Sequence, residues 1–209
     1  MANKKNKANI QKANQQKIKQ KQYEVATKNL FIFPCIALGL SVIALLSFFA
    51  NFVEIYLQGY GVEQSTSGWA FIAALLTNGY SSPTLSPSLA NVFYVFAEDW
   101  CAPLATVALL GALVLIINLA VQIVTLVKKL NVLNAVSAVL GLLAAILLIV
   151  CYAKGLDMKN ANILSDFCGG NPNCSIKSYA IVPAILAIGS AAVNAFAAVK
   201  TMQASKLLK

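Results

Sequence analysis

Four long apolar runs constrain this chain more than any other feature of its sequence. They cover residues 30–53, 102–127, 131–153 and 179–200, and they contain no acidic or basic side chain before Lys200 at the end of the fourth. A helix needs about 20 apolar residues to cross a hydrocarbon core of roughly 30 Å, because each residue advances it by about 1.5 Å. The chain is therefore predicted to be an all-α integral membrane protein with four transmembrane helices.

The distribution of lysine predicts the orientation of these helices. All 16 basic residues are lysines, and 13 of them lie before the first run, between the second and third runs, or at the end of the fourth run and after it. Six of the seven acidic residues lie in the other two connections. Because cytoplasmic segments are enriched in basic residues, we expect a multi-pass plasma-membrane protein with both termini in the cytoplasm.

The chain is thus divided into nine predicted segments. They are a cytoplasmic polybasic tail (1–29), transmembrane helix 1 (30–53), extracellular loop 1 (54–101), transmembrane helix 2 (102–127), a cytoplasmic turn (128–130), transmembrane helix 3 (131–153), extracellular loop 2 (154–178), transmembrane helix 4 (179–200) and a cytoplasmic tail (201–209). The lysines of the first tail favour contact with anionic lipid of the inner leaflet, where each contributes about 1 kcal/mol. The alternative for this tail is a solvated topology signal. Nucleic acid is not an expected partner, because the tail lacks arginine and interleaved aromatic residues.

Loop 1 is predicted to form an ordered extracellular cap. Residues 53–65 alternate between apolar and polar positions and contain two glycines, which predicts a short β-hairpin or two strand fragments. The apolar stretch from Trp69 is too short to span a bilayer, so it predicts an interfacial or re-entrant helix, and a second short helix is expected to end near Trp100. Both tryptophans are expected to anchor the cap at the outer interface.

The five cysteines are separated by the predicted topology. Cys168 and Cys174 flank the turn-forming sequence GGNPN, so we predict a disulfide between them. Cys101 and Cys151 end transmembrane helices 2 and 3 on the same outer face and form a second candidate pair. Cys35 lies on the cytoplasmic side, where thiols stay reduced.

Small and polar residues form a stripe along each apolar run at alternating spacings of three and four. In transmembrane helix 2 the stripe contains Ala108, Gly111, Leu115, Asn118, Gln122 and Thr125. The other stripes are Ala37, Ser41, Ala44, Phe48 and Asn51 in the first run, Asn134, Ser137, Gly141, Ala144, Leu148 and Cys151 in the third, and Ala187, Ala191, Asn194, Ala198 and Thr201 in the fourth. A shared period of 3.5 residues predicts a left-handed four-helix bundle with small residues at its centre. Five polar side chains are expected to gather at one level in the inner half of this bundle and to bond to one another: Asn118, Gln122, Asn134, Ser137 and Asn194.

The amino-acid composition also excludes several classes of enzyme and metal site. The chain has no histidine, which excludes Ser-His-Asp triads and most His-ligated metal sites, and no nucleotide-binding or metalloprotease motif is present. We expect no enzyme activity and no cofactor. The favoured function is a scaffold, accessory subunit or adhesion component that acts by protein contacts, with a membrane-protein partner or a second copy of the chain. The alternative is a small transporter or oligomeric channel with a polar path near Asn118, Gln122, Asn134 and Asn194.

The predicted layout resembles tetraspan proteins such as the claudin-like group. The resemblance covers the whole chain and concerns architecture: four spans, cytoplasmic termini and a larger first outer loop. Claudin-like first loops carry a tryptophan followed by a pair of cysteines, whereas Trp69 is followed by no such pair and Cys101 stands alone before the second span. No residue role is carried over from that group.

Overall fold

The structure is a computed structural model, and it describes residues 14–25, 28–57, 62–76, 102–128, 130, 132–160 and 174–206. Four helices within these ranges are long and apolar enough to cross a membrane. They are α2 (Ile32–Leu46, extended by the 3-10 helix η2, Ser47–Phe49), α5 (Ala102–Lys128), α6 (Leu133–Asn160) and α8 (Ile181–Ser205). The length and apolar composition of these four helices indicate that the chain is a multi-pass membrane protein.

Proline lies in the opening turn of three of these helices. Pro34, Pro103 and Pro183 are each the second or third residue of α2, α5 and α8. The first turn of a helix has no intrahelical acceptor for its amide groups, so a residue without an N–H costs nothing there. These prolines therefore mark helix starts and leave the spans uninterrupted.

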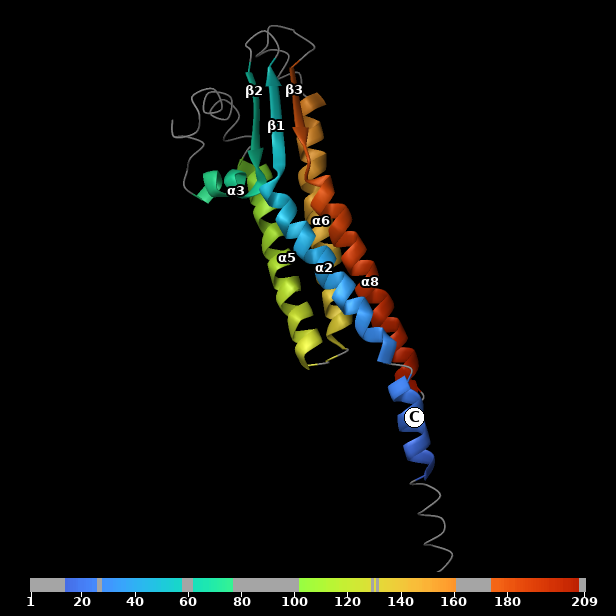
Figure 1. Cartoon of the computed structure of the whole chain (residues 1–209). Helices are drawn as coiled ribbons and strands as arrows, with labels where there is room; N and C mark the ends of the chain where they lie inside the picture. The colour runs from blue at the N-terminus through green and yellow to red at the C-terminus, as the bar shows by residue number, and fades with distance from the viewer. Residues whose placement is uncertain are drawn as a thin grey trace, which may run out of the picture.

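The four helices pack side by side as one bundle (Figure 1). Each contacts two neighbours, in the cyclic order α2, α5, α6 and α8. The helix of residues 14–25, the turn after α5 and the end of α8 lie at one end of the bundle, and a β-sheet lies at the other end. The lysine-rich segments that the structure describes are therefore separated from the sheet by the length of the bundle.

Small and polar side chains fill the interior of the bundle, and large apolar side chains cover its outside. All six stripe residues of α5 are buried, and so are the stripe residues of α6 from Asn134 to Cys151. Of the stripes predicted for α2 and α8, Asn51 is exposed and Thr201 is half-buried, because each lies beyond or near the end of the packed region. The outward residues include Ile43, Ile117 and Ile185, each more than half exposed. This is the arrangement expected when the surrounding medium is hydrocarbon.

Glycine permits the closest helix contacts. A Cβ atom added at Gly141 of α6 would lie 3.1 Å from the Cβ of Ala191 and 3.4 Å from the backbone oxygen of Ala187, both in α8. A Cβ added at Gly111 of α5 would lie 3.1 Å from the Leu148 side chain in α6. The short side chains therefore set the distances between these helices.

The sheet has three antiparallel strands in the order β2, β1, β3. They are β1 (Asn51–Leu57), β2 (Val62–Ser67) and β3 (Cys174–Ser178), and the 9-residue helix α3 (Gly68–Leu76) follows β2 directly. Strand β1 pairs with β2 in register from Val53 opposite Thr66 to Leu57 opposite Val62, with an irregularity between Asn51 and Val53. It pairs with β3 from Val53 opposite Ser178 to Leu57 opposite Cys174.

Three helices end elsewhere than the spans predicted from sequence, and one of them is α8, which continues to Ser205, beyond the predicted end at 200. The predicted first span runs to residue 53, whereas the helical backbone ends at Phe49, Ala50 is extended, and β1 begins at Asn51. Phe52 and Val53 are residues of β1 itself, and they are apolar because they are buried within the protein and not because they face lipid. Helix α6 continues to Asn160, beyond the predicted end at 153, because its last turns pack against β3.

Gly141 and Gly39 form a matched pair for testing the contact between α6 and α8. A leucine at residue 141 must displace Ala191 and the backbone of Ala187, so Gly141→Leu is expected to lower the free energy of unfolding by about 1–3 kcal/mol or more. An added Cβ at Gly39 meets nothing within 4 Å, so Gly39→Leu should cause no loss. Thermal unfolding of both variants in detergent measures the difference. Equal losses would contradict the close approach of α6 and α8.

Candidate functional site

The first part of the candidate site is a hydroxyl bridge between α5, α6 and α8. The Ser137 hydroxyl donates to Asn118 Oδ1 at 2.5 Å and accepts from Asn194 Nδ2 at 3.0 Å. All three side chains are fully buried. One hydroxyl therefore links three of the four spans.

A second hydroxyl bridge links α2, α5 and α8. The Ser190 hydroxyl donates to the Ala37 backbone oxygen at 2.9 Å and accepts from Gln122 Nε2 at 3.0 Å. The Ser41 hydroxyl lies 2.9 Å from that of Ser190. Because Ser190 has one proton and gives it to Ala37, Ser41 is the donor in that pair.

The two bridges lie within about one helical turn of each other. Asn118 and Gln122 are four residues apart in α5, and Ser190 and Asn194 are four residues apart in α8, so each pair lies on one helix face. Together with Ser41 and Ser137 they form what we call the polar layer: Ser41, Asn118, Gln122, Ser137, Ser190 and Asn194. The layer connects all four spans by side-chain hydrogen bonds.

The structure places the five residues singled out in the sequence as follows. Asn118 and Asn194 each bond to Ser137, while Gln122 bonds to Ser190. Asn134 is buried on α6, three residues before Ser137, and its Oδ1 has no hydrogen-bond partner in the described part of the chain. Ser190 and Ser41 also belong to this group of bonded side chains, although neither was predicted to be part of the cluster. The signal for Ser190 was its position four residues before Asn194 in a run otherwise made of small apolar residues.

Four amide atoms in and beside the polar layer have no hydrogen-bond partner among the residues that the structure describes. They are Asn118 Nδ2, Gln122 Oε1, Asn134 Oδ1 and Asn194 Oδ1. Each of the four residues is at most 2% exposed. A buried polar atom without a partner costs about 1–3 kcal/mol, so this group of atoms favours binding of a polar species.

The cysteines are only partly described. Cys101 and Cys168 lie outside the described residues, and Cys174 is placed in β3 without a described side chain. Of the cysteine side chains that the structure describes, Cys35 is free and exposed, and Cys151 is free and buried with its Sγ 3.8 Å from the Leu104 backbone oxygen. Both proposed disulfides, Cys168 with Cys174 and Cys101 with Cys151, stay predictions.

An aromatic cluster joins the sheet to the bundle. Phe48 of η2 stacks on Phe52 of β1, with ring centroids 5.1 Å apart, and its ring lies 5.3 Å from that of Trp69 of α3. Phe71 completes the cluster at 6.5 Å from Phe52. A Cβ at Gly68 would lie 2.7 Å from the Phe48 ring, so the ring packs directly on the glycine backbone. Trp69 is half-buried here, and its Nε1 has no hydrogen-bond partner among the residues that the structure describes, whereas Trp100 lies outside them.

Tyr179 fastens the other side of the sheet. Its backbone N–H donates to the Phe52 backbone oxygen at 2.9 Å, and its hydroxyl donates to Glu54 Oε2 at 2.6 Å. The hydrogen bond to Glu54, followed by partial desolvation and the negative charge of that carboxylate, raises the pKa of Tyr179 above its usual value of 10.0. The start of α8 is thereby tied to β1.

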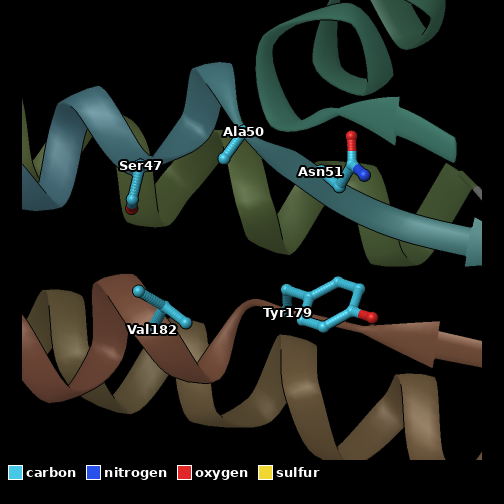
Figure 2. Close-up of a pocket in the computed structure, with 5 residues that line it drawn as sticks. All are labelled: Ser47, Ala50, Asn51, Tyr179 and Val182. Atoms are coloured by element: carbon cyan, nitrogen blue, oxygen red, sulfur yellow. The ribbon is translucent and has the colours of Figure 1, made fainter.

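A pocket of about 370 Å³ lies next to this junction. Its lining comes from two segments: Ser47, Ala50 and Asn51 around the start of β1, and Tyr179 and Val182 around the start of α8. In Figure 2 the Ser47, Ala50 and Val182 side chains extend into the space between the two segments, while the Asn51 amide points away from it. The Ser47 hydroxyl donates to the Ala44 backbone oxygen, which leaves a mostly apolar lining.

No family model, curated protein or solved structure matches the chain. Among the described residues, no group of three or more His, Cys, Asp or Glu side chains is placed to hold a metal ion. The functional inference therefore rests on the polar layer and on the junction between the sheet and the bundle.

A double-mutant cycle tests the Ser137 bridge. Asn118→Leu and Asn194→Leu should each lower the thermal stability modestly, since a side-chain hydrogen bond in a membrane bundle contributes about 0.6 kcal/mol on average and at most about 2. Their effects should be non-additive, because both amides bond to Ser137.

The matched control for this cycle is Asn118→Leu combined with Ser41→Ala, two residues that belong to different bridges and have no common partner. The control pair should be closer to additive. Strict additivity in the Asn118 and Asn194 pair would contradict the shared hydroxyl.

The Tyr179 hydrogen bond predicts a specific alkaline dependence. A group whose pKa is raised by folding adds stability that is complete below its unfolded pKa, near pH 10, and is lost as the pH rises through the folded value. The stability difference between the native chain and Tyr179→Phe should therefore be constant at neutral pH and should shrink above pH 10. Thermal unfolding of both proteins across this range gives the measurement. A difference unchanged to the highest pH would show that the hydroxyl makes no such bond.

Proposed function

We propose that the chain is a tetraspan plasma-membrane protein that acts by protein contacts, as a scaffold, accessory subunit or adhesion component. The observation that carries this proposal is the fixed junction between bundle and sheet. Tyr179, the aromatic cluster around Phe48 and the Gly68 contact hold the sheet against the helix ends. A sheet held in this way is a rigid surface at a set height above the membrane, which suits recognition of another protein.

The orientation and the finer architecture belong to the same proposal. Both termini are cytoplasmic, and the sheet and α3 form the extracellular cap. The four spans wind around one another as a left-handed supercoil. The exposed lysines at the end opposite the sheet, among them Lys17, Lys128 and Lys206, support this orientation through the positive-inside rule. They also support contact with anionic lipid of the inner leaflet.

The close packing of the interior favours a contact protein over a conducting one. Leu115 and Leu148 are fully buried inside the bundle, and α6 and α8 approach as closely as Gly141 permits. A continuous aqueous path through one bundle would have to displace these side chains. A small transporter or an oligomeric channel remains the second candidate, and the unpartnered amides of the polar layer are the observation in its favour.

Two measurements, recovery of a binding partner and flux in proteoliposomes, distinguish the contact protein from the transporter. Crosslinking in native membranes followed by affinity purification should recover a stoichiometric membrane-protein partner or a second copy of the chain. Gly68→Leu, which breaks the Phe48 contact and displaces the cap, should lose that partner, while Gly39→Leu on the lipid-facing side of α2 should retain it. In proteoliposomes the purified protein should add no solute or ion flux. Flux that disappears in Asn118→Leu, together with no specific partner, would replace the proposal with the transporter.

Labelling of introduced cysteines tests the orientation. Ser65 is exposed on β2, and Gln15 is exposed on the helix of residues 14–25. An impermeant maleimide should label Ser65→Cys in intact cells and Gln15→Cys only after permeabilisation. Labelling of Gln15→Cys in intact cells would invert the proposed topology.

A further inference from the structure

The amide groups of the polar layer have more hydrogen-bond donors and acceptors than the bonds within the layer satisfy. Ser137 donates to one amide and accepts from the other, so Asn118 and Asn194 each keep one free atom. Turning both amides by 180° reverses the direction of the bridge and exchanges the free nitrogen for a free oxygen. Either way, the pair presents one free donor and one free acceptor.

Two further acceptors lie within a turn of this pair. Gln122 Oε1 is on the same face of α5 as Asn118, and Asn134 Oδ1 is on the same face of α6 as Ser137. The amide atoms without a partner therefore include both a hydrogen-bond donor and acceptors, and the acceptors outnumber the donor. The residues that carry these atoms come from three helices that the Ser137 bridge already holds together.

The chemistry of these atoms restricts what can bind. No carboxylate or basic side chain occurs in the described spans at this level, so an ion would have no opposite charge to balance it in the membrane interior, at high cost. A neutral molecule that both donates and accepts meets the requirement. Water does so, and buried waters typically make about three hydrogen bonds to otherwise unsatisfied polar groups.

We propose that a water-binding site lies inside the membrane, formed by three members of the polar layer, Asn118, Gln122 and Asn194, together with the neighbouring Asn134. Bound water accepts from the free amide nitrogen and donates to the free amide oxygens. Asn134 is the second residue of α6, at the lysine-rich end of the bundle, so this end is the entry side. The fully buried Leu115 and Leu148 close the site toward the sheet.

Radiolytic hydroxyl labelling tests this site in the full-length protein in nanodiscs. Hydroxyl radicals formed from bound water modify the side chains beside it, so Leu115, three residues from Asn118, is the reporter. Leu104 is the control, because it is also buried in α5 but lies about 16 Å further along the helix. We expect a labelling rate at Leu115 several-fold above that at Leu104. Equal rates in the native protein would overturn the proposal.

Two further measurements sharpen the result. The combined Asn118→Leu and Asn194→Leu variant should lose the excess labelling at Leu115 and leave Leu104 unchanged; if this variant does not fold, the rates in the native protein decide. The thermal stability of the native protein should be the same in sodium, potassium and choline chloride at equal ionic strength. A rise with sodium or potassium alone would show a cation at these oxygens and would contradict water as the ligand.

Discussion

The fold depends on two serine hydroxyls that bridge helices in the membrane interior. Ser137 connects α5, α6 and α8, and Ser190 connects α2, α5 and α8, so that each helix is bonded to the rest through one of the two. Lipid tails are as apolar as leucine, so burial of apolar surface gives the spans little reason to associate. Directional bonds between polar groups, and contacts between small side chains, must then determine which helices become neighbours and at what depth they meet.

The small residues and the polar layer depend on each other. Hydroxyl bridges of this length form only when the helix backbones approach closely, and Gly111, Gly141 and the buried alanines allow that approach. The same closeness leaves no bulky side chain to cover the amides, so a polar group at this level must find a polar partner. The sheet is stabilised by different contacts: stacked phenylalanine rings and the Tyr179 hydrogen bonds, which are also common in the cores of soluble proteins.

Much of the bundle follows from the sequence because one constraint dominates it. An apolar run that must span hydrocarbon is helical, and the stripe of small residues then predicts which face is buried, as it does in α5 from Ala108 to Thr125.

The sheet was less predictable from the sequence than the bundle. Phe52 and Val53 continue the apolar run of α2, and their burial in an aromatic core depends on Trp69 and Phe71, which follow in the chain only after β2. The β1–β3 pair joins residues more than one hundred positions apart, which no local pattern indicates. Ser190 could not be predicted from sequence. A serine hydroxyl can bond either to the backbone of its own helix or to a neighbouring helix, and the residues around it in the sequence are the same in both cases.

Hydroxyl contacts between the helices hold the four spans together, and this can be measured best at the contact between Ser41 of α2 and Ser190 of α8. Their oxygens lie 2.9 Å apart across 149 residues of sequence. In a background with the native cysteines replaced by serine, Ser41→Cys with Ser190→Cys should form an intramolecular disulfide in native membranes when a membrane-permeant oxidant is added, seen as a linked peptide pair by mass spectrometry. A protein that remains folded while both thiols stay reduced would contradict the arrangement of the helices described above.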